Sequence, residues 1–291
     1  MRICHLSYDD PANPWLGGGG AVRARQIYRR LAAAHEVTLV TGGFRGAAAE
    51  EYVDGIRILR TGTAATYGRS RMEYALRAPQ ALDKLAWDVW VHEFSAFAPL
   101  CVPRRTRRRG VLLLYHLVGM HAVRKHPLVG LFAWLAERRV LAAYPRVITI
   151  SSSVRQAELR RVGGQVPVDC VGTGVDARYL ELEPADDPFV LYLGRLDVHT
   201  KGLDLLVAAF AVVARRHPGI ELVLAGRGGA GEADRLGRLV AASPARQRIR
   251  LEGAVNEDRK CDLLRRCRLF CMPSRYEGWG IAAIEAAAAG K

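Results

Sequence analysis

Short apolar runs alternate with longer amphipathic segments along most of the chain. The apolar runs predict β-strands at residues 3–8, 37–41, 56–60, 88–93, 111–116, 147–151, 189–195, 221–226, 249–255 and 268–274. The segments between them predict helices at residues 22–34, 71–85, 128–143, 154–161, 203–216, 232–242, 258–266 and 281–289. This alternation is typical of an α/β fold with a parallel sheet covered by helices on both faces. Continuously apolar runs such as VLLLY and VITI fit strands that are buried on both faces.

The alternation is interrupted at ELEPADDP (181–188), which carries two prolines and several acidic residues and predicts a linker. After it the strand–helix pattern begins again. We therefore expect two doubly wound, Rossmann-like domains, residues 1–182 and 183–291. Ligands of such sheets bind beyond the carboxyl ends of the strands, so a cleft between the two domains is the expected site.

Composition adds one unusual feature, a formal net charge of +14 in 291 residues. It favours an anionic partner such as nucleic acid, a membrane surface or a phosphorylated substrate. Only five of the 43 basic residues are lysine, and alanine is also abundant. Such a bias is common in proteins from GC-rich genomes, so both explanations stay open. The arginine run RRTRRR (104–109) predicts a solvated loop, with contact to phosphate or lipid headgroups as the alternative.

Several protein classes do not fit the sequence. The start MRICHLSY has no apolar core or cleavage site of a signal peptide, and no run of eighteen apolar residues could span a membrane. The six cysteines are scattered without a CxxC pair, which fits reduced core thiols in a cytoplasmic protein better than disulfides or a zinc site. No Asp-x-Asp pair occurs, and we expect neither a metal site nor a cofactor.

Two cations lie near the predicted end of one strand, in GRLDVHTKG. Arg195 follows the strand directly, and Lys201 precedes the next predicted helix. Together with the free N–H groups of that helix, they could converge on one anion. Arginine would bind phosphate oxygens as a fork and lysine as a point charge. A pair of solvated surface cations is the alternative.

The stretch PSRYEGWGIAAIE follows the last predicted strand. It places Glu277 in a loop and Glu285 about one turn into a helix, with Gly278 and Gly280 between them. Glycines allow the backbone to approach a ligand closely. A carboxylate accepts hydrogen bonds from neighbouring hydroxyls, which a ribose or hexose ring presents. Each acid alone could equally well be a helix-dipole partner or a solvated side chain.

Together these stretches resemble retaining glycosyltransferase family 4, the glycosyl transferases group 1. The resemblance is carried by GRLDVHTKG and PSRYEGWGIAAIEAAAAG, in which Glu277 and Glu285 form the family's E-x7-E motif. Weaker agreement runs in order through HEVTLVT, DVWVHE, LLYH, VITISSSV, GTGVD and LEGAVNED. It implies the GT-B fold, with two Rossmann-like domains facing a cleft. It also implies a metal-independent hexosyltransferase that moves a sugar from a nucleotide diphosphate sugar to a glycan or lipid-linked acceptor.

The resemblance also implies residue roles. Arg195 and Lys201 would hold the donor diphosphate, Glu285 the ribose, and Glu277 the hydroxyls of the donor sugar. His116 would face the reacting sugar, with His92 and His121 as competing candidates. The remaining donor-binding residues would be Gly18, Gly19, Gly20, Gly194, Gly253, Val255, Gly278, Trp279 and Gly280.

A glycine-rich loop extends from Gly17 to Gly20. It is not the dinucleotide-binding fingerprint, because Val22 stands where the third glycine is required. The resemblance implies that the loop approaches the donor diphosphate. A flexible surface loop is the alternative.

Other functions remain to be weighed. Members of the family continue beyond AAAAGK with a further strand and C-terminal helices, so we expect an incomplete second domain. An inactive nucleotide-sugar-binding fragment, or a different GT-B nucleotide-sugar enzyme, is therefore an alternative. Nucleic acid is not an expected partner, because interleaved aromatic residues and known motifs are lacking.

The predicted helix 128–143 mixes apolar residues with Arg138 and Arg139. It could place the protein peripherally on an anionic membrane, or be buried with a basic outer face.

Overall fold

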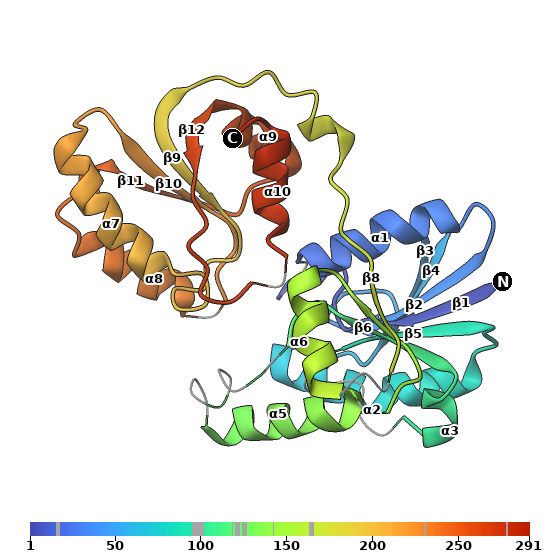
Figure 1. The fold of residues 1–291 in the computed structure, drawn as a ribbon. Helices are drawn as coiled ribbons and strands as arrows, with labels where there is room; N and C mark the ends of the chain where they lie inside the picture. Colours follow the sequence, from blue (N-terminus) through green and yellow to red (C-terminus); the bar gives the residue numbers. More distant parts are fainter. Residues whose placement is uncertain are drawn as a thin grey trace. The chain divides into compact units, whose positions relative to one another are not determined.

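The computed structural model describes residues 1–15, 18–94, 102–117, 119, 123, 127–141, 143–162, 166–229, 231–277 and 279–291. The chain divides into two compact units, Met1–Thr173 and Gly174–Lys291, and Figure 1 follows it from the blue N-terminus to the red C-terminus. The boundary expected at 182/183 falls inside the second unit, because Tyr179 and Leu182 pack into that unit's core. The expected cleft between the domains stays a prediction.

The first unit is built on an eight-stranded sheet in the order β3-β4-β2-β1-β5-β6-β7-β8, in which only β3 runs antiparallel to its neighbour. Its strands are β1 (Arg2–Leu6), β2 (Glu36–Gly42), β3 (Glu50–Val53), β4 (Ile56–Thr61), β5 (Val89–Glu93), β6 (Gly110–Leu114), β7 (Val147–Thr149) and β8 (Val168–Cys170). Its helices are α1 (Gly19–Leu31), α2 (Tyr67–Lys84), α3 (Arg104–Arg107), α5 (Pro127–Leu141) and α6 (Ser152–Val162).

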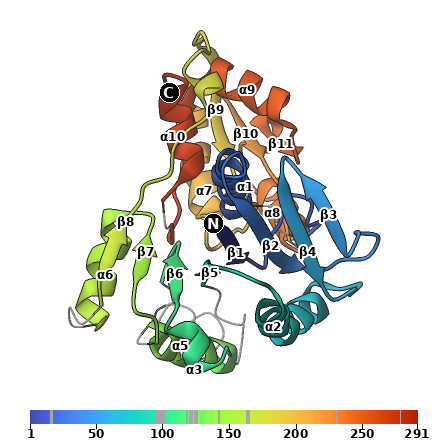
Figure 2. The same ribbon diagram turned by 90° about the vertical axis from the view of Figure 1, so that its right-hand side faces the viewer.

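Helices cover both faces of this sheet. Leu6 of β1 belongs to a buried cluster with Tyr74 and other α2 residues, whereas Ile3 of the same strand packs in a second cluster with Tyr28 of α1. Figure 2 shows α1 and α2 on opposite sides of the strands. Successive strand residues point to opposite faces, so burial on both faces explains why a central strand such as β6 (GVLLL) is apolar throughout.

Two local features of the first unit differ from the sequence interpretation. Residues 50–53 form β3, which pairs with β4 through a two-residue turn at Asp54 and Gly55, both with positive φ. Asp-Gly between extended segments is a strong hairpin signal that the interpretation missed. The arginine run is not a loop throughout: Arg104–Arg107 forms the helical turn α3, and the Arg109 guanidinium lies 4.7 Å from the centroid of the Trp87 ring.

The second unit contains a parallel sheet in the order β11-β10-β9-β12. Its strands are β9 (Asp187–Leu193), β10 (Glu221–Ala225), β11 (Ile249–Gly253) and β12 (Cys267–Phe270). Its helices are α7 (Leu203–Arg216), α8 (Glu232–Ala241), α9 (Glu257–Arg266) and α10 (Ile281–Ala288), with 3-10 turns η1 (Ala177–Tyr179) and η2 (Arg246–Arg248). Tyr192 packs with α7 and α8, whereas Leu191 packs with α9 and α10. The two helix pairs lie on opposite faces in Figure 1, so the unit is doubly wound.

Two observations concern the protein's surroundings. Within the described residues, no helix is both long enough and apolar enough to cross a membrane. The described cysteines are unbonded; Cys4 and Cys267 are buried, whereas Cys170 is exposed and is therefore not the core thiol that the sequence interpretation expected.

Candidate functional site

The carboxyl edge of the second sheet gathers most of the predicted donor-binding residues. Gly194 and Arg195 follow β9, Gly253 ends β11, and the loop that carries Glu277 follows β12. All four strands run parallel, so these segments leave the sheet at the same edge. This is the edge at which open α/β sheets bind their ligands.

Lys201 and Glu277 form an ion pair at this edge. The Lys201 Nζ lies 2.5 Å from the Glu277 Oε2, and the Ser274 hydroxyl donates to the same oxygen at 3.3 Å. The Lys201 side chain is 15% exposed and that of Glu277 is 30% exposed, so solvent reaches the pair only in part. The sequence interpretation gave these two residues separate partners on the donor; the structure brings them into direct contact.

Further contacts fix the Lys201 loop against the Glu277 loop. Arg275 makes a bidentate ion pair with Asp204 in the first turn of α7, at 2.7 and 2.9 Å. The Arg275 guanidinium also donates to the carbonyl of His199 at 2.8 Å, and the Arg275 backbone N–H donates to the carbonyl of Thr200 at 3.0 Å. The Arg275 guanidinium lowers the pKa of Asp204 and so keeps this carboxylate charged. Residues on both sides of Lys201 are therefore held, and its position does not depend on Glu277 alone.

The two loops approach so closely that only glycine fits between them. Gly202, the N-cap of α7, has a φ of +66°, and a Cβ there would lie 2.1 Å from the carbonyl oxygen of Pro273. Gly280 caps α10 with a φ of +77°, and a Cβ there would lie 2.8 Å from the Met272 Cε. Neither N-cap contributes a side-chain acceptor. The first N–H groups of α10 can therefore bind an anion, whereas in α7 the Leu203 N–H donates to the Val198 carbonyl at 2.9 Å and the next N–H groups donate to the Asp204 carboxylate.

Arg195 differs from Lys201 in its surroundings. It is exposed, and the Tyr192 hydroxyl donates to its carbonyl oxygen at 2.7 Å. Among the described residues, none makes a hydrogen bond or ion pair with the Arg195 guanidinium. Its backbone is fixed, and its charged group can bind a ligand.

Glu285 belongs to a second polar group. Its Oε1 lies 2.7 Å from the Lys260 Nζ, which is also 3.6 Å from Glu257. The Tyr179 hydroxyl donates to Glu257 at 2.9 Å, and the Lys260 ammonium lies 5.1 Å from the Tyr179 ring centroid. Burial raises the pKa of Glu285, although Lys260 opposes the shift. Sequence reasoning missed Lys260 and Tyr179. The i, i+3 spacing of Glu257 and Lys260 could have indicated Lys260.

The other predicted pocket residues of this unit have different surroundings. Trp279 is half-buried, and its buried indole N–H has no hydrogen-bond partner among the described residues. Val255 packs its side chain against the core on the α9 and α10 face. The Gly253 carbonyl accepts a hydrogen bond from the N–H of Gly226 at 2.7 Å. Gly278 lies outside the described residues.

In the first unit, the glycine-rich segment opens a helix. Gly18 is the N-cap of α1, and its N–H donates to the Asp9 carboxylate at 2.9 Å. Gly19 and Gly20 form the first turn of α1, which begins three residues before the expected position. The Tyr115 hydroxyl donates to the Gly20 carbonyl at 3.3 Å. Gly17 lies outside the described residues, and Gly18 to Gly20 form the start of α1 and not the flexible surface loop that was the alternative.

Three histidines are candidates for the residue that faces the reacting sugar. His116 follows β6 and is exposed at the carboxyl edge of the first sheet. His92 is buried, with its Nδ1 2.6 Å from the Tyr144 hydroxyl, so it belongs to the core. His121 lies outside the described residues. His116 is therefore better placed than His92 to meet a substrate.

A buried acid beneath the start of α1 was not predicted. A Cβ on Gly20 would lie 3.7 Å from Oε1 of Glu93, the last residue of β5, and the His5 Nε2 lies 3.6 Å from the Glu93 Oε2. Burial raises the pKa of Glu93 to about 8, with a further contribution from Asp9, and burial lowers the pKa of His5 to about 3. Both groups are therefore largely neutral at pH 7. An acid that ends an otherwise apolar strand, as in DVWVHE, was the available signal.

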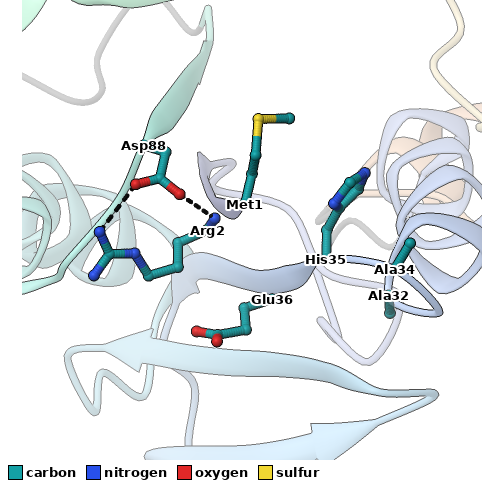
Figure 3. Close-up of a pocket in the computed structure, with 7 residues that line it drawn as sticks. All are labelled: Met1, Arg2, Ala32, Ala34, His35, Glu36 and Asp88. Atoms are coloured by element: carbon teal, nitrogen blue, oxygen red, sulfur yellow. Dashed lines mark hydrogen bonds and ion pairs between the residues drawn. The ribbon is translucent and has the colours of Figure 1, made fainter.

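Figure 3 shows a hollow of the first unit lined by Met1, Arg2, Ala32, Ala34, His35, Glu36 and Asp88. It lies at the amino ends of β1 and β2, opposite the edge that carries His116. Arg2 and Asp88 form an exposed ion pair in it, at 2.9 Å. None of the predicted site residues lines this hollow. In the part of the chain that the structure describes, no group of three or more His, Cys, Asp or Glu residues could hold a metal ion.

The two Rossmann-like units have the GT-B fold. The particular family follows from the sequence models. The model for Glycosyltransferase Family 4 matches residues 17–179, and the model for Glycosyl transferases group 1 matches residues 178–291. The chain belongs to glycosyltransferase family 4, which confirms the family resemblance and the predicted fold class.

Individual relatives agree with this assignment. The chain is 26% identical to the glycogen synthase of Mycobacterium tuberculosis, over all of this chain and 76% of that protein. It is 32% identical to the phosphatidyl-myo-inositol mannosyltransferase of the same species, over 49% of this chain and 38% of that protein. Among solved structures, sucrose-phosphate synthase from Thermosynechococcus elongatus superposes with a TM-score of 0.82 at 22% identity, covering all of this chain and 80% of that one.

Replacing Gly202 tests the contact between the two loops. We expect Gly202→Ala to lower the free energy of unfolding of the second unit by about 1–3 kcal/mol, because alanine is strained at positive φ and its Cβ overlaps Pro273. Denaturant unfolding measures the change. Gly219→Ala is the matched control, because nothing lies near its Cβ position and its φ is not positive. Equal stability of the two variants would contradict the close approach.

Glu93 predicts a specific pH dependence. The unfolded chain loses this proton near pH 4.5 and the folded chain near pH 8, so folding retains a proton between these values. The free energy of unfolding should fall as pH rises through this interval, by up to about 1.4 kcal/mol per pH unit from this group. Glu93→Gln should remove that contribution, so the free energy of unfolding of the variant should fall less with rising pH than that of the wild type. Unfolding of both proteins at pH 5 and pH 8 is the measurement, and parallel profiles would refute the assignment.

Proposed function

We propose that this glycosyltransferase takes its sugar from a nucleotide diphosphate sugar. It transfers the sugar, with retention and without a metal ion, to a glycan or lipid-linked acceptor. The observation that carries the proposal is the Lys201–Glu277 ion pair at the carboxyl edge of the second sheet, with the exposed Arg195 on the same β9–α7 loop. The names of the relatives, a glycogen synthase and a mannosyltransferase, support the same class of reaction.

The diphosphate would be bound by two cations and one helix N-terminus. Arg195 can offer a planar fork and Lys201 a point charge, while α10 presents backbone N–H groups without a side-chain cap. Negative charge grows on the phosphate oxygens as the sugar departs. Donors that are already in position therefore stabilise the transition state more than the ground state.

Glu277 would bind hydroxyls of the donor sugar and not act as a nucleophile. Its Oε2 already accepts hydrogen bonds from Lys201 and Ser274, which lowers its nucleophilicity. A carboxylate has about four lone-pair sites, so the remaining ones can accept from hydroxyls. The unpartnered indole N–H of Trp279 supplies a donor for the same ring. Glu285, paired with Lys260, would accept from the ribose hydroxyls.

The reaction would proceed on one face of the donor sugar. The bond between the anomeric carbon and the phosphate oxygen breaks, and the acceptor oxygen forms the new bond on the same side. The acceptor proton passes to the departing phosphate oxygen. Resemblance to the family supports this course, and Arg195 and Lys201 would neutralise the leaving group throughout.

Lys201→Ala tests the proposal. We expect kcat/KM for nucleoside diphosphate release from the donor to fall by about 30- to 1,000-fold, equivalent to about 2–4 kcal/mol, because a charge aimed at the leaving group is lost. Lys84→Ala, at the exposed end of α2, is the control and should retain full activity. Near wild-type turnover by Lys201→Ala would rule out this role. Donor binding without turnover by the wild type would favour a binding protein instead.

The acceptor side includes an exposed apolar helix face. Leu128, Leu131, Phe132 and Leu135 of α5 are 86%, 44%, 51% and 49% exposed, at the i, i+3, i+4, i+7 spacing of one helix face. Exposed Arg138 and Arg139 follow in the last turn. The opposite face of α5, with Ala133, Glu137 and Leu141, is buried. We infer that α5 rests on an anionic membrane surface at the cytoplasmic side, where a lipid-linked acceptor would lie.

Vesicle co-sedimentation tests the membrane inference. Wild-type protein should sediment with phosphatidylglycerol-containing vesicles at low salt, and a Leu128→Ser, Phe132→Ser double variant should lose most of this binding, because the apolar face no longer inserts. Leu205→Ser, which changes an exposed leucine of α7, is the control. If wild-type protein stays in the supernatant, the inference is wrong.

A further inference from the structure

Three aromatic rings and an arginine gather at the carboxyl edge of the first sheet, apart from the residues considered above. Tyr8 follows β1, Trp15 lies in the loop before α1, and Tyr67 begins α2. The Tyr67 ring centroid lies 6.0 Å from that of Tyr8 and 6.3 Å from that of Trp15, both edge-to-face. The Arg71 guanidinium lies 4.6 Å from the Tyr8 ring centroid and 5.7 Å from that of Tyr67. We call these four residues the aromatic surface.

The base of the aromatic surface is rigid. Tyr8 is buried, its hydroxyl donates to the Ser70 hydroxyl at 3.2 Å, and Ser70 donates to the Gly43 carbonyl at 2.6 Å. Its ring also packs edge-to-face on Tyr74, with centroids 5.5 Å apart. The Tyr8 ring therefore supports the more exposed residues from below.

The loop that carries Trp15 is fixed as well. Asp10, buried in that loop, forms an ion pair at 2.8 Å with Arg60, which is also buried and pairs with Glu51. The Asn13 side-chain oxygen accepts a hydrogen bond from the backbone N–H of Trp15 at 2.9 Å. Buried ion pairs lock geometry because separating them leaves an uncompensated charge. Trp15 is thus held in place before any ligand binds.

The outer part of the surface faces solvent. Tyr67 is 41% exposed, and Trp15 and Arg71 are half-buried. Aromatic rings that are held at a surface combine a large apolar face with polar edges. A sugar ring matches them, because its faces carry C–H groups and its edge carries hydroxyls. Arg71 can donate to those hydroxyls, and its charge disfavours a cationic ligand at the same rings.

We propose that the aromatic surface binds a neutral hexose unit of a carbohydrate acceptor. The proposal rests on the proposed function and names the chemistry of its acceptor side. Only β5 separates β1 from β6, so the ends that carry Tyr8 and His116 lie about 10 Å apart. The stacked ring therefore differs from the sugar unit whose hydroxyl reacts near His116. The ligand is an oligosaccharide and not a monosaccharide.

Binding to an array of neutral hexose oligosaccharides, including α-glucans and α-mannans, tests the proposal. We expect the wild type to bind at least one of them, and a Trp15→Ala, Tyr67→Ala double variant to bind it at least about tenfold more weakly. Tyr67→Phe keeps the ring and should bind like the wild type. Met72→Ala is the control, because Met72 is 66% exposed on the same helix and lies outside the cluster.

Two results would overturn the proposal: wild-type protein that binds none of the oligosaccharides, or a double variant that binds them as well as the wild type does. Circular dichroism checks that the double variant is folded. If it is not, the single variant Tyr67→Ala, at a side chain that is 41% exposed, decides the test by its own loss of binding. Failure of the proposed function is recognised separately. The donor residues lie in the second unit, so Lys201→Ala should bind the oligosaccharides normally while losing transfer.

Discussion

The proposed donor site depends on the packing of two loops in the second unit, one after β9 and one after β12. Gly202 lies so close to Pro273 that a side chain would not fit there. Arg275 forms a bidentate ion pair with Asp204. Lys201 and Glu277 extend from these same loops, so their charges are in place before a ligand arrives. Charge that is already oriented needs no rearrangement during reaction, which makes it effective in stabilising a leaving diphosphate.

The parallel sheets supply the frame for this arrangement. The loops that follow the strands of the second sheet all lie at one edge, because the strands are parallel. Helices packed against both faces hold the strands in place. The first unit uses the same edge of its own sheet for the start of α1, for His116 and for the aromatic surface. Ion pairs accompany both edges: the buried pair of Asp10 and Arg60 in the first unit, and the half-buried pair of Glu285 and Lys260 in the second. We attribute donor chemistry to the second unit and acceptor recognition to the first.

Much of this frame is predictable from the sequence, because apolar strands and amphipathic helices have distinct periods and the E-x7-E stretch is specific. The α7 helix, for example, begins and ends where expected. What escaped prediction depends on contacts between distant residues. Lys201 meets Glu277 and Lys260 meets Glu285, and no local pattern encodes these two pairings. Burial keeps Glu93 protonated, which depends on the helix packed above it. The domain boundary was placed too late, because Tyr179 belongs to the second core although it precedes the proline-rich segment.

The central claim is that the second unit binds the diphosphate of a nucleotide sugar without a metal ion. Calorimetric titration of UDP, GDP and ADP into the protein, in buffer containing EDTA, tests it most directly. Our account predicts saturable binding of at least one of the three, weakened by added salt because the contacts are largely ionic. Absence of binding by all three would contradict the account.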